Sequence, residues 1–285
     1  MKKGYSDLSD GKIPKRTQKT FREWNKILDK FDIKEKGHTL AAKHLREKYN
    51  LSDWRSQVIA IKYEQMDNKK ILICVDRDGT LIYDNKYYLG RTNNWRSKIK
   101  ILKTVVKGLK KINKKLPEAK IYMITNQSGV AVKEFTLLTK KRAGEVCKAV
   151  IRRIKEKGAR IDGYILCPHV SPKYAKESKL KFNKRFVCNC TCIKPSPGMV
   201  LEALKKEGFR KKDTNIYVIG DRKSDVETAH NISGTGILVP FKNESDEDMK
   251  LMRHKKNKSY RDKTYIAEDF LDASDFLFRR EKQIC

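Results

Sequence analysis

Two aspartates, Asp76 and Asp78, follow a short apolar run over residues 71–75. Gly79 and Thr80 come next, so the chain turns sharply where a buried strand would deliver its side chains to an edge. Such a pair is suited to phosphoryl transfer, because one carboxylate can attack phosphorus while the other protonates the leaving oxygen and later deprotonates the attacking water. An Asp-Gly turn after a purely structural strand has the same residues. The rest of the chain decides between these interpretations.

Alternating strand and helix patterns predict the elements that position this pair. Apolar, β-branched runs predict buried strands at residues 71–75, 120–125, 161–166, 215–219 and 236–239, and a last short one from residue 265. Helical spacing predicts helices over residues 101–112, 146–154 and 197–204, and a closing helix that reaches residue 278. The alternation predicts an α/β fold: a Rossmann-like parallel sheet with helices on both faces and no large cap.

Further polar residues stand near the ends of the other predicted strands. Thr125 and Asn126 follow the second strand, Lys194 precedes the helix after the third, and Asp221 and Asp225 follow the fourth. In an open parallel sheet the carboxyl ends of the strands meet at one edge, where ligands bind. Thr125 and the backbone amides after Asn126 can hydrogen-bond phosphoryl oxygens, and Lys194 can neutralise the charge that develops on them.

Magnesium is the cofactor that these residues predict. Asp76 and Asp78 from one strand and Asp221 from another can hold Mg²⁺ through a few oxygens, leaving waters and a phosphate to complete the octahedron. Each of these features is weak alone, but their order along the chain favours a phosphoryl-transfer site.

The motifs VDRDGTL, ITNQSGV, KP and VIGDRKSD resemble those of the haloacid dehalogenase superfamily of aspartate-nucleophile phosphatases, over roughly residues 70–280. The resemblance implies that catalysis proceeds through an aspartyl phosphate. It also implies a role for each motif residue: Asp76 as nucleophile, Asp78 as general acid and base, Thr125 as phosphate binder, Lys194 as charge-compensating lysine, Asp221 as a further Mg²⁺ ligand and Asp225 as a residue behind the ligands.

Four of the seven cysteines gather around one histidine. Cys167 and His169 are followed, after a long loop, by Cys188, Cys190 and Cys192. In a chain without a secretory signal, such a cluster indicates metal before disulfide. Three cysteines and one histidine would form a tetrahedral zinc site.

This loop, residues 167–192, resembles the zinc loop of the capless phosphatases that act on heptose 1,7-bisphosphate and on histidinol phosphate. The resemblance implies Cys167, His169, Cys190 and Cys192 as zinc ligands, with Cys188 as a possible replacement for a neighbour. The zinc would be structural, because protein ligands fill all four positions.

Two departures from that branch affect the predicted substrate. Ile193 stands where the relatives usually carry an arginine that helps to read the substrate, and the loop between His169 and Cys188 is longer and basic. The Pro-x-Pro-Gly-Met run favours the heptose branch, whereas Gly-Asp-Arg favours the histidinol branch. The leading hypothesis is a Mg²⁺-dependent phosphomonoesterase acting on a small phosphorylated metabolite, most like a sugar bisphosphate or histidinol phosphate.

Two other hypotheses remain open, and the first of them rests on charge. The chain of 285 residues has 66 Lys and Arg against 35 Asp and Glu, a formal charge of +31. Such an excess attracts polyanions, so nucleic acid is a possible partner and a 3′-phosphorylated strand end an alternative substrate; general lysine usage would give the same charge. The third hypothesis is a binding or scaffold protein whose functional part is the helical N-terminal stretch, residues 19–67. Without a signal peptide or an 18-residue apolar run, the sequence predicts a cytoplasmic protein without a membrane partner.

The N-terminal part has a different pattern. Residues 1–18 predict a disordered basic lead, and residues 19–67 predict a small domain of three helices before the phosphatase-like domain, residues 70–285. The helical stretch resembles a small helical domain of uncharacterised function, which implies no activity. Trp24 and Trp54 are predicted to lie in its core.

Overall fold

The computed structural model describes residues 17–67, 69–83, 88–241 and 262–284. Two compact units make up the chain: Met1–Lys69 with Arg279–Cys285, and Lys70–Phe278. Most of the predicted basic lead, residues 1–18, lies outside the described residues.

Within residues 17–67, the smaller unit contains three helices: α2 (Phe21–Phe31), α3 (Ile33–Tyr49) and α4 (Asp53–Asp67). Thr20 begins α2 with a capping box, in which its hydroxyl accepts from the Glu23 amide and the Glu23 carboxylate accepts from the Thr20 amide. Trp24 is 1% exposed and lies in the core, as predicted. The same prediction for Trp54 is wrong, because this side chain is 46% exposed. It lies in the first turn of α4, before the buried run that starts at Val58.

The larger unit is built on six parallel strands in the order β3-β2-β1-β4-β5-β6, which confirms the predicted sheet. The strands are β1 (Lys70–Asp76), β2 (Lys120–Asn126), β3 (Gly163–Cys167), β4 (Thr214–Gly220), β5 (Thr235–Leu238) and β6 (Thr264–Ile266). Because β1 and β4 are neighbours at the centre, their carboxyl ends lie side by side. Val75, near the end of β1, is paired with Ile219 near the end of β4.

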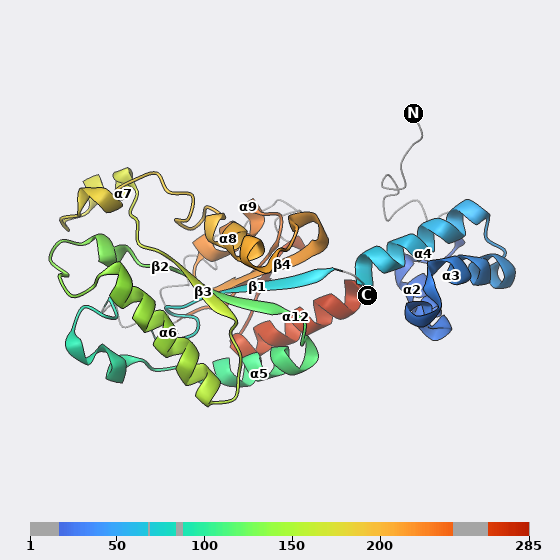
Figure 1. Ribbon diagram of the computed structural model, residues 1–285, viewed down its shortest axis with the longest axis horizontal. Helices are drawn as coiled ribbons and strands as arrows, with labels where there is room; N and C mark the ends of the chain where they lie inside the picture. The colour runs from blue at the N-terminus through green and yellow to red at the C-terminus, as the bar shows by residue number, and fades with distance from the viewer. Residues whose placement is uncertain (1–16, 68, 84–87, 242–261, 285) are drawn as a thin grey trace. The chain divides into compact units, whose positions relative to one another are not determined.

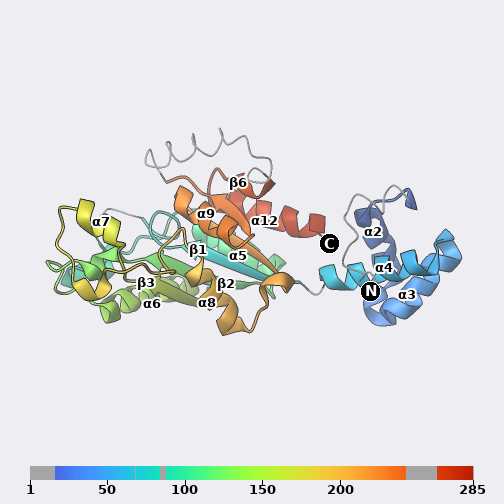
Figure 2. The same cartoon turned by 90° about the horizontal axis from the view of Figure 1, so that it is seen from above.

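Helices cover both faces of this sheet (Figures 1 and 2). The covering helices are α5 (Val105–Lys115), α6 (Lys140–Glu156), α8 (Gly198–Glu207), α9 (Lys223–Asn231) and α12 (Phe270–Ile284), whereas the short α7 (Pro172–Glu177) has no buried residue. Side chains of α5, α6 and α12 pack with Ile73 and Val75 of β1, whereas α8 and α9 pack with Leu72 and Cys74. Successive strand residues point to opposite faces, so the continuous apolar run of β1 supplies both cores.

Between β1 and α5, the described residues contain a 3-10 helix, Asn93–Lys98, and no cap domain. Helix α5 begins at Val105 rather than at Ile101 as predicted. Ile101 instead pairs with Ile82 in an isolated β-bridge, which fixes the loop after β1. Among the described helices, none combines the length and apolarity that crossing a bilayer requires.

Candidate active site

The predicted site residues come together at the carboxyl edge of the sheet. Asp76, Asp78, Thr125, Asn126, Lys194, Asp221 and Asp225 all line one cavity of about 660 Å³. Asp76 ends β1, and Asp221 follows β4 directly, so the central pair of strands delivers both carboxylates to the same place. The parallel register therefore explains why motifs distant in sequence form a single site.

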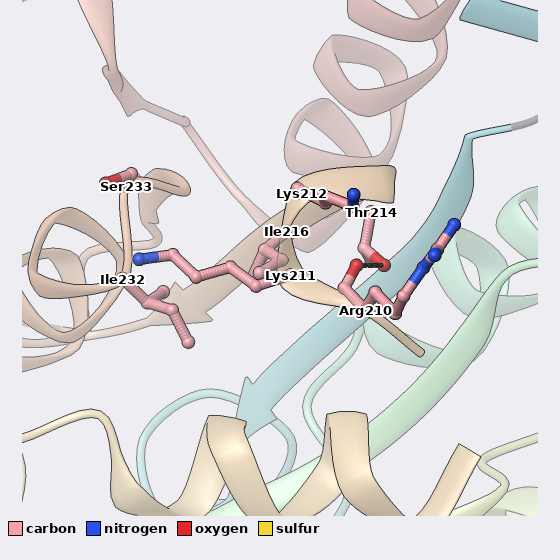
Figure 3. Close-up of a pocket in the computed structure, with 7 residues that line it drawn as sticks. All are labelled: Arg210, Lys211, Lys212, Thr214, Ile216, Ile232 and Ser233. Atoms are coloured by element: carbon pink, nitrogen blue, oxygen red, sulfur yellow. Dashed lines mark hydrogen bonds between the residues drawn. The ribbon is translucent and has the colours of Figure 1, made fainter. Parts of the chain in front are cut away.

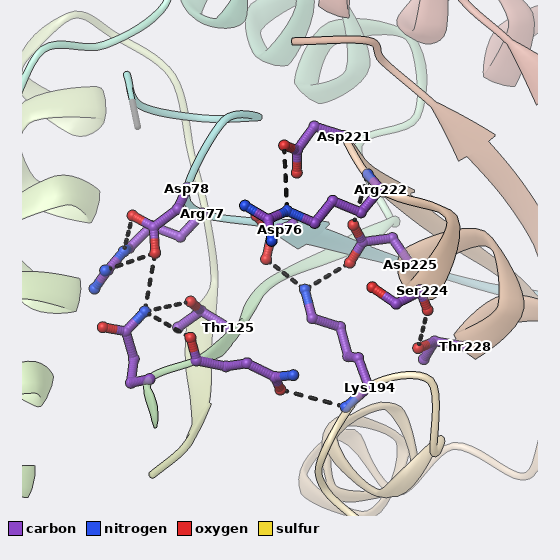
Figure 4. Close-up of polar contacts among 12 residues, drawn as sticks. Asp76, Arg77, Asp78, Thr125, Lys194, Asp221, Arg222, Ser224, Asp225 and Thr228 are labelled. Atoms are coloured by element: carbon purple, nitrogen blue, oxygen red, sulfur yellow. Dashed lines mark hydrogen bonds and ion pairs between the residues drawn. The ribbon is translucent and has the colours of Figure 1, made fainter. Parts of the chain in front are cut away.

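A buried lysine lies at the centre of the cluster. The Lys194 amine donates to Asp76 Oδ1 and, at 2.5 Å, to Asp225 Oδ1 (Figure 4). The side chain of Lys194 is only 5% exposed. Burial lowers the pKa of Lys194, but the charges of Asp225 and Asp76 outweigh this and raise it above its usual value. Lys194 therefore stays charged, and Asp225 fixes its position.

The carboxylates of Asp76, Asp221 and Asp225 outnumber the two cations that pair with them, Lys194 and Arg222. Burial raises the pKa of Asp221 to about 8, with further contributions from the charges of Asp76 and Asp225. The pKa of Asp76 is raised to about 7 by burial and by Asp225 and Asp78, although Lys194 opposes the rise. A divalent cation would relieve this repulsion, and carboxylate oxygens are the ligands that Mg²⁺ prefers. The donor set therefore fits a magnesium ion.

Two glycines allow the carboxylates to approach this closely. A Cβ atom on Gly79 would overlap with the carboxylate of Asp221, and one on Gly220 would overlap with that of Asp225. Gly79 also has a φ of +83°, in the left-handed region that favours glycine. The space beside each carboxylate is thus available only because the neighbouring residue has no side chain.

Asp78 is held separately from this cluster. Its Oδ1 accepts from Arg77 Nε at 2.9 Å, and its Oδ2 accepts from Arg77 Nη2 at 2.7 Å. Gln127 Nε2 also donates to Asp78 Oδ2 at 2.9 Å and to Thr125 Oγ1 at 2.8 Å. Figure 4 shows the Asp78 carboxylate turned toward Arg77, while Lys194 joins Asp76 and Asp225. The two motif aspartates thus have different partners, as two different chemical roles require.

The cysteine loop brings part of the predicted zinc set together. Ligand atoms of Cys167, His169 and Cys190 lie within 4.8 Å of one another. Cys167 Sγ lies 3.6 Å from His169 Nδ1. Cys192 is outside that group, but its backbone amide donates to Cys190 Sγ at 3.4 Å. Two thiols and an imidazole so close together suit Zn²⁺; Cys192 and Cys188 both remain candidates for the fourth ligand.

A second cavity, of about 510 Å³, lies at the opposite end of β4, around Thr214 (Figure 3). Its cations, Arg210, Lys211 and Lys212, are exposed side chains, and its lining has no carboxylate. This cavity has none of the residues that the motifs predict for chemistry.

The sequence is similar to those of known phosphatases, which agrees with the residues that line the first cavity. Residues 191–273 match a family model described as HAD-hydrolase-like. The histidine biosynthesis bifunctional protein HisB of Blochmanniella floridana is 30% identical over 172 residues, which cover 60% of this chain and 41% of that protein. The D-glycero-alpha-D-manno-heptose-1,7-bisphosphate 7-phosphatase of Mycobacterium bovis is 29% identical over 160 residues, 56% of this chain and 71% of that protein. Over much of its larger unit, the chain is thus similar to haloacid dehalogenase-like hydrolases.

A solved structure supports the same assignment of fold. The chain resembles the crystal structure of D,D-heptose 1,7-bisphosphate phosphatase from B. bronchiseptica, complexed with magnesium and phosphate, with a TM-score of 0.55 and 18% identity. The match covers 73% of this chain and 98% of that one. The family resemblance predicted from the motifs is confirmed. The chain spans about two fifths of the length of the HisB proteins that it matches.

Sequence reasoning missed two residues that contact the motifs. Arg77 lies between the two motif aspartates, and Gln127 follows Thr125 by two positions. An arginine at the end of a strand buried on both faces was a usable signal, since a buried guanidinium needs a carboxylate partner. Gln127 gave no such signal, because a glutamine after a strand is ordinary in a loop.

The raised pKa values predict how the metal-free domain responds to pH. Asp221 and Asp76 have folded pKa values of about 8 and about 7, above the value of about 3.9 for an unfolded aspartate. The folded state therefore binds more protons, and the free energy of unfolding falls as pH rises from about 4 through 7–8. We expect the thermal unfolding temperature in chelator to fall over this interval.

The Asp221→Asn variant is the control for this dependence. Because it removes one of the buried charges, its unfolding temperature should fall less steeply with pH than that of the wild type. Added Mg²⁺ should stabilise the wild type more at pH 8 than at pH 6, since the ion binds ionised carboxylates. If the unfolding temperatures of wild type and variant fell equally with pH in chelator, Asp221 would not be a source of the pH dependence.

Proposed function

We propose that the chain is a Mg²⁺-dependent phosphomonoesterase that works through an aspartyl phosphate on Asp76. The observation that carries the proposal is the common cavity of Asp76, Lys194 and Asp221, with Asp78 on its wall. A nucleophile, a fixed cation, a divalent-metal donor set and a separately held acid are the components that phosphoryl transfer needs.

Each component has a distinct task in the reaction. Asp76 attacks phosphorus, and the bond to the leaving oxygen breaks while Asp78 gives that oxygen a proton. Asp78 then takes a proton from the water that attacks the aspartyl phosphate, which restores Asp76 and releases phosphate. Thr125, the amides after Gln127 and Lys194 hold the phosphoryl oxygens, whereas the Gln127 amide itself donates to the Cys167 carbonyl. Mg²⁺, held by the carboxylates of Asp76 and Asp221 and by the main-chain oxygen of Asp78, would offset the charge of the phosphate when bound.

We propose a small phosphorylated metabolite as substrate, either a sugar bisphosphate or histidinol phosphate. The names of the Mycobacterium bovis and Blochmanniella floridana relatives support this class. The cavity wall offers tyrosines for ring or hydroxyl contacts and the cations Lys98 and Arg222 for a second anionic group, and Ile193 lines it as well. The relatives give no support to the nucleic-acid partner that the charge of the chain suggested.

Phosphate release in the presence of Mg²⁺ tests the proposal directly. The panel would contain heptose bisphosphate, histidinol phosphate, other sugar phosphates and a 3′-phosphorylated oligonucleotide. We expect one small phosphate to be preferred, as measured by kcat/KM, and activity to vanish in chelator. Turnover of the oligonucleotide alone would overturn the proposed substrate class, and failure to release phosphate from any compound would overturn the proposed reaction.

We also propose that the cysteine loop holds one structural zinc ion through Cys167, His169, Cys190 and Cys192. In metal analysis of the purified chain, the Cys192→Ser variant should therefore retain far less than one zinc per chain. Cys188→Ser is the matched control and should keep its zinc. The reverse pattern would identify Cys188 as the fourth ligand, and full zinc content in both variants would contradict a four-ligand site of this composition.

A further inference from the structure

Arg77 is almost completely buried although it lies beside the active-site cavity. It is 1% exposed, whereas the side chain of Asp78, its partner, is 27% exposed. The Arg77 guanidinium meets the Asp78 carboxylate through two parallel hydrogen bonds, from Nε at 2.9 Å and from Nη2 at 2.7 Å. This fork geometry fixes the plane of a carboxylate, which a single point charge does not.

The other side of the guanidinium is also occupied. Arg77 Nη1 contacts the Sγ atom of Cys147, on the inner face of α6, at 3.8 Å. Cys147 is itself completely buried. Arg77 therefore cannot turn away from Asp78 without leaving a buried charge unpaired, which is costly. The rigid core of the domain thus sets the orientation of Asp78.

The hydrogen bonds of Asp78 distinguish its two oxygens. Oδ2 accepts from both Arg77 Nη2 and Gln127 Nε2, so both of its lone-pair directions are used. Oδ1 accepts from Arg77 Nε alone among the described residues. A carboxylate oxygen has two acceptor directions. One direction on Oδ1 therefore remains for a proton that is exchanged with a ligand.

We propose that Arg77 is a positioning residue for the proton-transfer step, which it confines to Oδ1 of Asp78. The inference rests on the proposed function. When Asp76 forms its bond to phosphorus, the ester P–O bond breaks and its electron pair goes to the leaving oxygen. That oxygen takes the proton from Asp78 Oδ1, and the same atom later receives a proton from the attacking water. Arg77 and Gln127 hold the carboxylate in the orientation that both transfers need.

Leaving-group dependence separates this role from a merely structural one. An alkyl phosphate has a poor leaving group that needs a proton, whereas p-nitrophenyl phosphate has a good one that needs little help. The measured quantity is kcat/KM for each, because it reports the step up to cleavage of the ester even if hydrolysis of the aspartyl phosphate is slower. The alkyl substrate would be the compound of the panel above that is hydrolysed fastest.

The test variant is Arg77→Lys, which keeps the charge but loses the fork. We expect its kcat/KM for the alkyl phosphate to fall by about 100-fold or more, and for p-nitrophenyl phosphate by only a few fold. Asp78→Asn should show the same selective loss. In the double variant the losses should not multiply, because both changes remove the same proton transfer. Equal losses on both substrates, or losses that multiply, would overturn the proposal.

A second variant covers the case in which Arg77→Lys does not fold, as circular dichroism would reveal. Gln127→Met removes a hydrogen bond from Asp78 Oδ2 and buries no charge, so the alkyl-to-aryl ratio of kcat/KM should shift in the same direction. An unchanged ratio in that variant would overturn the proposal. If the wild type hydrolyses both substrates but the variants leave the alkyl-to-aryl ratio of kcat/KM unchanged, only the proposed role of Arg77 is wrong. If the wild type hydrolyses neither, the proposed function fails with it.

Discussion

Replacing Asp76 with asparagine should abolish phosphate release, lowering kcat by about four to six orders of magnitude, while the protein stays folded. An amide does not attack phosphorus, so no aspartyl phosphate can form. The fold should tolerate the change, because the amide oxygen can still accept from Lys194 and burial already raises the pKa of Asp76 to about 7, which favours its neutral form. Steady-state phosphate release and thermal unfolding, followed in the same samples, would check both statements.

The matched control is Asp275→Asn on α12, where the carboxylate pairs with Lys111 and is 33% exposed. Activity should be unchanged in that variant. Acid-quenched samples supplied with labelled substrate should carry covalent phosphate in the control and none in Asp76→Asn. Substantial turnover by Asp76→Asn would refute the assignment of the nucleophile.

Replacing Lys194 with methionine should reduce both activity and stability. Asp76 and Asp225 would stay buried without the cation that pairs with them, and breaking a buried ion network in this way costs about 3–5 kcal/mol. At pH 8, urea denaturation should show that the free energy of unfolding falls by about 3–5 kcal/mol. The kcat should fall by about 1,000-fold. The loss should be smaller at pH 5, where Asp76 is protonated.

Lys206→Met on α8 is the control for this prediction. Lys206 pairs with Glu202 at 3.2 Å, but its side chain is 48% exposed, so the pair should contribute less than about 1 kcal/mol. If Lys194→Met were as stable as this control at pH 8, the network around Lys194 would not stabilise the fold in the way described above.

The sheet could be predicted from sequence because its strands are buried on both faces. Runs such as residues 71–75 have no polar interruption, so their length and β-branched composition indicate strands directly. Helix boundaries were less predictable. The start of α5 shifts to Val105 because Ile101 pairs with Ile82, a contact between loops that periodicity does not encode.

The residues of the candidate site could be predicted for a topological reason. Strands of a parallel sheet end at one edge, so the order of the motifs is sufficient to bring Asp76, Thr125 and Asp221 together. The identity of each partner could not be predicted, since it depends on side-chain direction: the position of Arg77 in a buried strand indicates that it needs a carboxylate, but not which one. Nothing in the spacing indicates that Arg77 faces Asp78, or that Asp225 rather than a substrate anchors Lys194.

The glycine contacts beside the carboxylates have a consequence for how the domain can be re-engineered. Any side chain at Gly79 or Gly220 would displace Asp221 or Asp225, so saturation mutagenesis of the inner site should yield almost no active clones. The outer wall of the cavity includes Tyr174, whose side chain is 45% exposed. Mutant libraries designed for activity on a new substrate should therefore vary residues of the outer wall and keep the residues of the inner site unchanged.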